Sequence, residues 1–391
     1  MNLARKLWQR GRDLLPSAGF HFDRPLVVLQ SDDWGRVGLR DQGLEQLRAA
    51  GIELGERAYD FYTFETAEDL AALAAMLKRH HDSTGRNPCL QMNFIVGNLN
   101  FARMKEDGFQ SIHFLPLADG LPEPWNRPGL ISAYKEGIAE SVFYPALHGT
   151  THFCRQAVER NLRLDGERAQ LLRKLWRACT PYIHWRMPWI GYEYWDPEQP
   201  GEERFLPVEI QRDLIGQAVG GFAKLFSTLP RSACAPGYRA DDNTQRAWAQ
   251  HGIRVAQNGP GALLPPHFGR HGILQICRTV EFEPATDPSC SVEECVRNAE
   301  ACFEHGLPAI VSVHSINFHS TVRDYRSTTL RLLDEFLVAL ESRHSDLLYL
   351  HDEDLHAIVS KGGYERGGAA VRVNVTRKNF VKARGERQIK E

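Results

Sequence analysis

The chain has 391 residues, of which 42% are hydrophobic and 25% charged, and its formal net charge at pH 7 is −2. This is the composition of a globular protein that buries a large core without help from disulfides. The near-neutral charge excludes a general electrostatic attraction to nucleic acid or anionic lipid, so we expect no nucleic-acid partner.

The cysteines and the apolar segments indicate the compartment. Eight cysteines are scattered without a Cys-x-x-Cys pair, which indicates neither a zinc knuckle nor a disulfide framework. The first residues lack the apolar core and cleavage site of a secretory signal, and no apolar run approaches the roughly 18 residues of a membrane span. We therefore expect a cytoplasmic protein with free thiols.

Residues 1–24 form the first predicted unit, a basic amphipathic segment. Leucines and a tryptophan fall near one helical face, with four basic residues among them. The pattern fits a helix lying on a membrane surface, and it also fits a surface helix that caps the fold.

Residues 25–360 alternate between short apolar runs and helical patterns, which predicts one catalytic domain. The apolar runs are PLVVLQS, CLQMNFIV, SVFYPALH, RSACAPG, IRVAQ, ILQICRTVEF, AIVSVHS and LLYLHDE, and helices are expected at 66–79, 154–180, 207–229, 244–252, 292–305 and 328–342. This alternation is typical of a parallel sheet with crossover helices. We predict an α/β fold, a distorted (β/α) barrel of about seven parallel strands with long inserted loops.

Residues 361–391 form the last predicted unit, a basic tail. It carries nine Lys or Arg against three Glu. Such a segment can attract anionic lipid or phosphate, and it also fits a solvated, partly disordered end of the chain.

In such barrels the chemistry lies where strands end and loops begin, at the carboxyl ends of the strands. Applied to this chain, the rule brings acids, histidines and one arginine to the same rim: Asp32, Asp33, His148, His152, Arg239, Asp241, Asp242, Glu281, Glu283 and His314.

Asp32 and Asp33 end the first predicted strand. Adjacent residues of a strand point to opposite faces, so the two carboxylates are suited to different tasks. One can bind a metal ion while the other takes a proton from the attacking water. A cap for the following helix is the alternative interpretation.

His148 and His152 lie four residues apart after an apolar strand. This spacing lets two imidazoles reach one ion from a tight turn. Zinc accepts two histidines and one carboxylate and keeps positions open for water and substrate. Two histidines hydrogen-bonded at the start of a helix are the alternative, and the nearby carboxylate favours the metal site.

SDDWG resembles the first motif of the polysaccharide deacetylase (carbohydrate esterase 4) family, and HGTTH resembles its second, metal-binding motif. The resemblance runs in order over roughly residues 26–359. It implies that Asp32 is the catalytic base and that Asp33, His148 and His152 bind the metal.

Two later motifs extend the resemblance. APGYRADD is similar to the third motif in the branch that contains the deformylase of lipid-linked aminoarabinose, which implies that Arg239 orients Asp32 and that the backbone near Tyr238 helps to bind the oxyanion. IVSVHS is similar to the last motif, which implies that His314 protonates the leaving amine. The family's common Asp-x-Trp string is missing, so the partner of His314 is open among Glu281, Glu283, Asp241 and Asp242.

The run YIHWRMPWIGYEYWDP, residues 182–197, is rich in aromatic side chains. Flat rings beside polar groups suit a sugar face, and they suit ordinary core or oligomer contacts equally well. The candidates for substrate contact are Trp189 and Tyr192, within a group that includes Trp185, Tyr194 and Trp195, together with Trp34 and Tyr238.

These features predict a hydrolase that uses one divalent ion, zinc by preference, to remove an acetyl or formyl group from an amino sugar. The missing export signal points to a nucleotide-linked or lipid-linked precursor of an envelope polysaccharide, and the basic termini allow peripheral membrane contact. Hydrolysis of another C–N amide, as in a ureide, and noncatalytic sugar binding are the alternatives. The sequence leaves the oligomeric state open.

Overall fold

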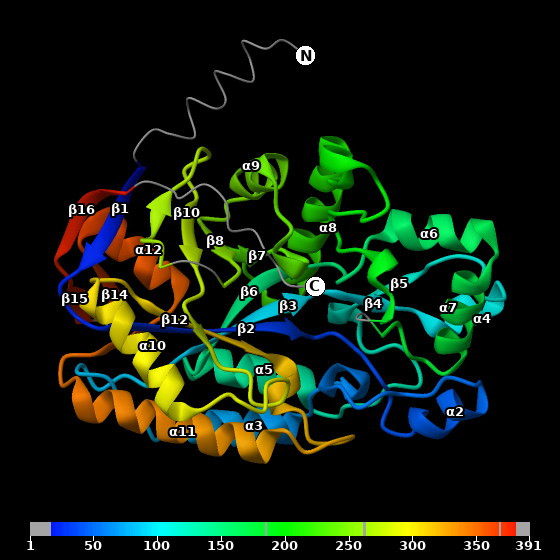
Figure 1. Ribbon diagram of the computed structural model, residues 1–391, viewed down its shortest axis with the longest axis horizontal. Helices are drawn as coiled ribbons and strands as arrows, with labels where there is room; N and C mark the ends of the chain where they lie inside the picture. The colour runs from blue at the N-terminus through cyan, green and yellow to red at the C-terminus, as the bar shows by residue number, and fades with distance from the viewer. Residues whose placement is uncertain (1–16, 184–185, 261–262, 367–368, 381–391) are drawn as a thin grey trace, which may run out of the picture.

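A curled, mainly parallel sheet forms the centre of the molecule (Figure 1). The computed structural model describes residues 17–183, 186–260, 263–366 and 369–380. The sheet runs in the order β11-β12-β2-β3-β6-β7-β8-β10-β9, with β13 paired to β2. Its strands are β2 (Leu26–Trp34), β3 (Leu90–Ile95), β6 (Phe143–Gly149), β7 (Ser232–Cys234), β8 (Val255–Asn258), β9 (His267–Phe268), β10 (Leu274–Cys277), β11 (Val280–Glu281), β12 (Ala309–His314) and β13 (Leu348–Leu350).

Each predicted apolar run contains one or two of these strands, which confirms the α/β barrel prediction. Strands β2, β3 and β12 are buried almost throughout, as expected for parallel strands covered on both faces. Short β9 is antiparallel to β10 and extends one edge.

One run of chain joins the two ends of the sheet. Strand β10 pairs with β8, whereas β11, which starts three residues later, pairs with β12. The two residues between them bond to both neighbours, because Arg278 N donates to Asn258 O (3.2 Å) and Thr279 N donates to Ile310 O (2.9 Å). This seam closes the barrel, and it holds Arg278 fully buried.

Helices pack around this sheet in the positions that the periodicity predicts (Figure 1). Helices α3 (Ala67–Leu77), α10 (Val292–Glu304) and α11 (Arg326–Arg343) lie along one side with α5 (Leu130–Ala139), while α8 (Val208–Phe226) and α9 (Asp242–Gln250) lie on another. The helix predicted over 154–180 is two helices, α6 (Arg155–Leu164) and α7 (Glu167–Arg177). Asp165 adopts φ +49° between them, and Gly166 follows in an extended conformation.

Helices α2 (Gly43–Ala49), α4 (Phe101–Glu106), α5 and α12 (Asp352–Lys361) were not among the sequence predictions. All four are ten residues or shorter, a length at which a 3.6-residue period is hard to separate from loop sequence. A hairpin of β4 (Gly97–Leu99) and β5 (Phe114–Pro116) lies within one of these connections.

The ends of the described chain come together. Strand β1 (Ser17–Phe22) pairs antiparallel with β16 (Val375–Phe380), and β14 (Gly363–Arg366) pairs with β15 (Ala369–Arg372). The tail predicted from residue 361 is therefore ordered over these strands, where Tyr364 and Val373 join Phe20 and Phe22 in a buried cluster. Most of β15 and β16 is exposed, as the prediction of a solvated tail expects. The predicted amphipathic segment up to residue 16 and the last part of the tail lie outside the described residues.

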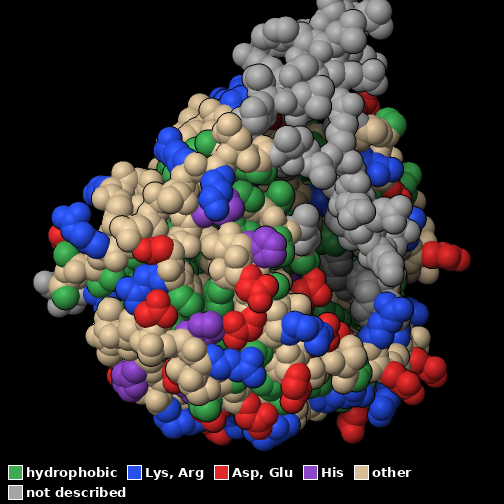
Figure 2. All heavy atoms as spheres, turned by 60° about the vertical axis from the view of Figure 1, so that its left-hand side comes forward, with side chains coloured by type: hydrophobic (Ala, Val, Ile, Leu, Met, Phe, Trp, Pro, Cys, Tyr) green, Lys and Arg blue, Asp and Glu red, His purple; other side chains and the backbone are tan. Residues whose placement is uncertain are grey.

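The surface agrees with the balanced charge of the sequence. Figure 2 shows acidic and basic side chains interspersed over one face of the molecule. Among the described residues, no helix combines the length and apolar character needed to cross a bilayer.

Candidate metal and catalytic site

Three predicted ligands meet at the carboxyl end of the sheet. Asp33 Oδ1 lies 3.3 Å from His152 Nε2 and 3.7 Å from His148 Nε2, and the ligand atoms of the three residues all lie within 4.8 Å of one another. Asp33 Oδ1 is buried without a hydrogen-bond partner. A buried carboxylate oxygen that accepts no hydrogen bond and faces two imidazole nitrogens is suited to bind a cation together with them.

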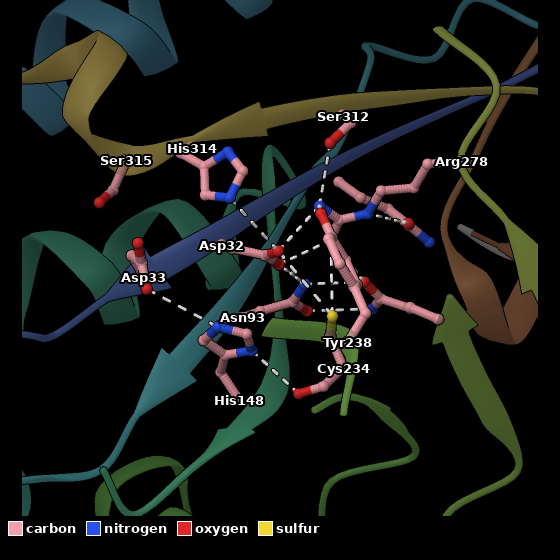
Figure 3. A network of polar contacts seen from close by, with 12 residues as sticks. Asp32, Asp33, Asn93, His148, Cys234, Tyr238, Arg278, Ser312, His314 and Ser315 are labelled. Atoms are coloured by element: carbon pink, nitrogen blue, oxygen red, sulfur yellow. Dashed lines mark hydrogen bonds and ion pairs between the residues drawn. The ribbon is translucent and has the colours of Figure 1, made fainter. Parts of the chain in front are cut away.

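The backbone of β2 brings this about. The pairing of β2 with β3 shifts register between Ser31 and Trp34, and Asp33 adopts φ +74°. Non-glycine residues occupy this region only at an energetic cost, which tends to be found at functional sites. Asp33 points toward His148 at the end of β6, whereas Asp32 points toward Arg278 and Asn93 (Figure 3).

Surrounding groups orient the ligands. His148 Nδ1 donates to Cys234 O at 2.9 Å, which leaves Nε2 for the site, and such a hydrogen bond to the far nitrogen is the usual support for a metal-binding histidine. Arg36 Nη2 donates to Asp33 Oδ2 (3.1 Å), and the Tyr62 hydroxyl donates to Asp33 O (2.8 Å).

The loop between the histidines rests on Glu193. This buried carboxylate accepts from Thr150 N (2.8 Å) and Thr151 N (3.2 Å). Gly149 has φ +112°, and a Cβ atom there would lie 2.0 Å from Glu193 Oε2. Only glycine fits both the backbone conformation and the close approach.

The protonation states suit a metal. Burial raises the pKa of Asp33, but Arg36 and the two histidines outweigh it and hold this pKa well below the usual range. Burial lowers the pKa of His148. An ionised carboxylate and a neutral imidazole are the forms that bind metal ions.

A second set of donor atoms, from Asp32, His148 and Cys234, is also compact. Burial raises the pKa of the Cys234 thiol well above its usual range, so this sulfur stays protonated and is a poor ligand. The oxygens of Asp32 are already paired with Arg278. The set with Asp33 therefore fits a metal, and the set with Asp32 does not.

Arg278 holds Asp32 from the seam of the barrel. Its Nη1 and Nη2 donate to Asp32 Oδ2 (2.8 Å) and Oδ1 (2.6 Å), and Asn93 Nδ2 donates to Oδ1 (2.5 Å). Burial alone would raise the pKa of Asp32, but Arg278 and the nearby histidines hold it far below the usual range. Asp32 is thus a fixed anion.

The expectation that Arg239 orients Asp32 is wrong. Arg239 instead stacks on Trp195, with its Cζ atom 4.7 Å from the ring centroid. Arg278, in the buried link between β10 and β11, fills the role instead, because its guanidinium donates to both oxygens of Asp32. The Tyr238 hydroxyl accepts a hydrogen bond from Arg278 Nη1 (2.9 Å).

The expected role of the backbone near Tyr238 in binding the oxyanion also lacks support. Tyr238 N already donates to Ala235 O at 2.8 Å in the turn after β7. An amide that is satisfied in this way is not free to bind a developing charge.

A buried polar network lies beneath Asp32. Gln257 exchanges hydrogen bonds with Asn93 and accepts from Arg278 Nη2 (3.1 Å), and it also donates to Asp352 (3.1 Å). Asp352, the first residue of α12, further accepts from the side chains of Gln30, Gln91 and Ser232. Fully satisfied networks of this kind are rigid, and this one fixes the two groups that hold Asp32. No pattern in the sequence predicts this network.

His314 ends β12 with Glu283 as its partner. Its Nδ1 donates to Glu283 Oε1 (2.6 Å), while Nε2 lies 3.8 Å from Asp32 Oδ2. Asn317 Nδ2 donates to Glu283 Oε2 (2.7 Å). Burial alone would lower the pKa of His314, but Glu283 together with the aspartates raises it to about 9.

The other candidate partners of His314 have different neighbours. Asp241 caps α9 through Thr244 N, Asp242 pairs with Arg270 and His271, and Glu281 is exposed.

The aromatic residues predicted to contact substrate lie in different surroundings. The Tyr192 ring lies 5.6 Å from the His152 ring and therefore borders the site. Trp34 is wrong as a pocket residue, because it is fully buried and stacks on Phe318 at 5.7 Å. Trp189 is also wrong: it is buried in the core, under the Arg168 guanidinium. Trp185 lies outside the described residues.

Sequence reasoning also missed Arg36, Tyr59 and Tyr62. Arg36 stands three residues after Asp33, which was a usable signal, and its Cζ atom lies 3.9 Å from the Tyr62 ring centroid. Tyr59 comes from the loop after α2, and its ring meets that of His314 edge-on at 6.3 Å. Nothing in the sequence around Tyr59 marks that loop as part of the site.

No protein-family model matches the chain, and no curated protein matches it either. Among solved structures it is similar to one from Mycobacterium smegmatis described as a polysaccharide deacetylase, with 12% identity, a TM-score of 0.46 and coverage of 89% of this chain and 96% of that one. A family 4 carbohydrate esterase from Streptomyces lividans in complex with acetate has 10% identity, a TM-score of 0.34 and coverage of 83% and 91%. A CE4 family pseudoenzyme from Bacillus anthracis has 12% identity, a TM-score of 0.37 and coverage of 86% and 68%.

Structures at this level of similarity include an enzyme complex and a pseudoenzyme, so similarity of this kind does not carry an activity to the chain. The residues of the site must support the function by themselves. The similarity of the third motif to the aminoarabinose deformylase branch stays a prediction.

Proposed function

We propose that the protein is a metal-dependent hydrolase that removes an N-acyl group, acetyl or formyl, from an amino sugar. The observation that carries the proposal is the contrast between two adjacent carboxylates at one rim. Asp33 faces two imidazole nitrogens with an unsatisfied oxygen, while Asp32 is held as an anion opposite a protonated His314.

Asp33, His148 and His152 would hold the ion. Two nitrogen donors and one oxygen donor match the preference of zinc, and a three-ligand site keeps positions open. When bound, the ion supplies Lewis acidity to the amide carbonyl and to the attacking water.

Asp32 and His314 divide the proton transfers. Asp32 accepts a proton from water as the water oxygen bonds to the carbonyl carbon, and Arg278 keeps that carboxylate ionised and aimed. His314 donates the proton on Nε2 to the amine nitrogen as the C–N bond breaks, leaving a free carboxylic acid and an amine. Glu283 accepts the hydrogen bond from Nδ1–H of His314, which keeps that nitrogen protonated and directs Nε2 toward the site.

Tyrosines flank this space on two sides. Tyr59 borders His314, and Tyr192 borders His152. Aromatic rings with a polar edge suit the alternating apolar and hydroxyl faces of a sugar, which favours an amino sugar over a small ureide.

The test is release of acetate or formate from N-acetyl and N-formyl amino sugars by the purified full chain. We expect activity that a chelator abolishes and zinc restores, with Asp32→Asn as a matched inactive control that still binds zinc. Sugar binding without release in the zinc-loaded protein would support the noncatalytic alternative. Hydrolysis of allantoin in place of every sugar amide would support the ureide alternative.

A further inference from the structure

Arg239 is a half-buried cation without a counter-ion. Its guanidinium stacks on Trp195, and its Nε is buried with no hydrogen-bond partner. Within the part of the chain that the structure describes, no carboxylate lies within ion-pair distance of it, whereas Arg278, Arg36 and Arg160 each have an aspartate. Burying an N–H group without an acceptor costs free energy, and among the described residues no acidic side chain lies beside this guanidinium to compensate.

Arg239 stands next to the proposed catalytic centre. It follows the Pro236–Tyr238 turn at the carboxyl end of β7. Tyr192 lies between Arg239 and the ligands: its ring is 5.6 Å from that of His152 and 6.1 Å from that of Trp195.

The platform beneath Arg239 is fixed. Trp195 and Tyr192 exchange backbone hydrogen bonds of 2.8 and 2.9 Å, and Trp195 also forms a bridge with Phe205. A guanidinium that lies over an aromatic ring can still donate hydrogen bonds from its N–H groups to an oxyanion. Arg204 lies over the same ring at 5.6 Å and adds a second positive charge.

We infer that Arg239 and Trp195 form an anion subsite and that the amino sugar carries a phosphate ester close to the amide that is hydrolysed. The inference rests on the proposed function and deepens it by giving the substrate class. Two arginines around one ring favour the spread charge of a phosphate over a single carboxylate. A nucleotide-linked sugar and a lipid-linked sugar share this chemistry.

The decisive measurement is binding to the metal-free protein, so that phosphate oxygens have no ion to bind. Isothermal titration calorimetry would compare N-acetylglucosamine 1-phosphate with N-acetylglucosamine. We expect the wild type to bind the phosphorylated sugar at least about tenfold more tightly, the effect of one charge-assisted contact. Arg239→Gln should reduce that ratio to near one, and Arg239→Lys, which keeps the charge but loses the planar fork, should retain part of it.

The matched control is Arg331→Gln, which removes one positive charge from an exposed position of α11 and should keep the wild-type ratio. UDP-N-acetylglucosamine and a short polyprenyl diphosphate N-acetylglucosamine in detergent distinguish the two carriers, since the true carrier adds affinity beyond the 1-phosphate. Tighter binding of N-acetylmuramic acid, a carboxylate, than of the phosphorylated sugar would overturn the phosphate assignment.

Hydrolysis assays separate this inference from the proposed function. Amide hydrolysis with equal kcat/KM for phosphorylated and neutral sugars, unchanged by Arg239→Gln, would overturn the subsite while the proposed function stands. A phosphate preference in binding that Arg239→Gln removes, in a protein that hydrolyses no amide, would leave the subsite and overturn the proposed function.

Discussion

Asp32 and Asp33 are neighbours in the sequence, yet they belong to two halves of the site with opposite character. The ligand half, Asp33 with His148 and His152, leaves a buried carboxylate oxygen without a hydrogen bond. In the proton half, which consists of Asp32, Arg278, His314 and Glu283, both carboxylates are held by charged partners.

The difference shows which half is complete. A buried polar group left unsatisfied is costly, so the ligand half has to be completed by something the chain does not supply. The proton half is already in its working state, with an anion and a cation held by the chain itself. A substitution in one half should therefore leave the other half unchanged.

The largest effect is expected from removing the carboxylate of the ligand half. Asp33→Ala should lower zinc affinity by more than about 100-fold, because losing only an outer partner of a metal ligand already costs up to about 100-fold. Amide hydrolysis should fall below detection. Zinc titration followed by calorimetry measures the first effect. Full zinc occupancy in this variant would move the metal to another set of residues.

The next largest effect is expected from neutralising Asp32. Asp32→Asn should lower turnover by roughly 10²- to 10⁴-fold, the usual cost of losing a positioned base. Zinc stoichiometry should stay at the wild-type value, because the ligand half is untouched. Parallel metal analysis and rate measurement check both statements, and a variant that loses zinc would show that the two halves are not separate.

Much of the fold could be predicted from sequence because strand burial leaves a local mark. Runs such as residues 26–29 and 309–313 are continuously apolar, and the rule that chemistry follows strand ends then placed Asp33, His148, His152 and His314 at one rim. The structure brings these four together. The helix break at Asp165 and the closing strands β14 to β16 left no such mark.

The arginine of the proton half could not be predicted for a physical reason. Arg239 sits in the string that resembles the family motif. Arg278 sits between β10 and β11, where its own backbone N–H donates to Asn258 of β8 and that of Thr279 donates to Ile310 of β12. Its position depends on how the barrel closes, which is set by pairing between residues far apart in the chain. Glu283 is similar: sequence reasoning included it among four candidates, and only its distance to His314 selects it.

If Arg278 and not Arg239 holds Asp32, the two arginines should contribute differently to the free energy of unfolding. Arg278→Met should destabilise the fold by about 3 to 5 kcal/mol, because it leaves Asp32 buried and charged without its partner. Arg239→Met, the matched control, should cost less than about 1 kcal/mol, as is usual away from such pairs. Urea unfolding measures both.

Adding Asp32→Asn to Arg278→Met sharpens the result. If the two residues form a pair, the double variant should be more stable than the sum of the single losses implies. A larger loss from Arg239→Met than from Arg278→Met would return the orienting role to Arg239.

The smallest effect is expected from Glu283→Gln, which changes the pH range over which His314 is protonated. Burial lowers the pKa of His314, and Glu283 is the main group that raises it, to about 9. The wild type therefore keeps its general acid protonated at neutral pH, and its rate should fall as pH rises toward 9, somewhat earlier when a metal ion is bound nearby. Without the carboxylate, burial dominates, and the alkaline limb should move to lower pH. The rate ratio between variant and wild type should then be closest to one at acid pH, should fall as pH rises, and should level off above about pH 9.

Stability should follow the same sign. The folded-state pKa of His314 is raised above its ordinary value of 6.5, so its contribution to the free energy of unfolding is fully present below about pH 6.5 and is lost as pH rises through about 9. The stability difference between wild type and Glu283→Gln should shrink over that window. Glu281→Gln, an exposed carboxylate two residues away, is the matched control and should keep the wild-type alkaline limb. If Glu283→Gln also keeps the wild-type alkaline limb, His314 is not the acid whose protonation limits turnover, and another residue must donate the proton.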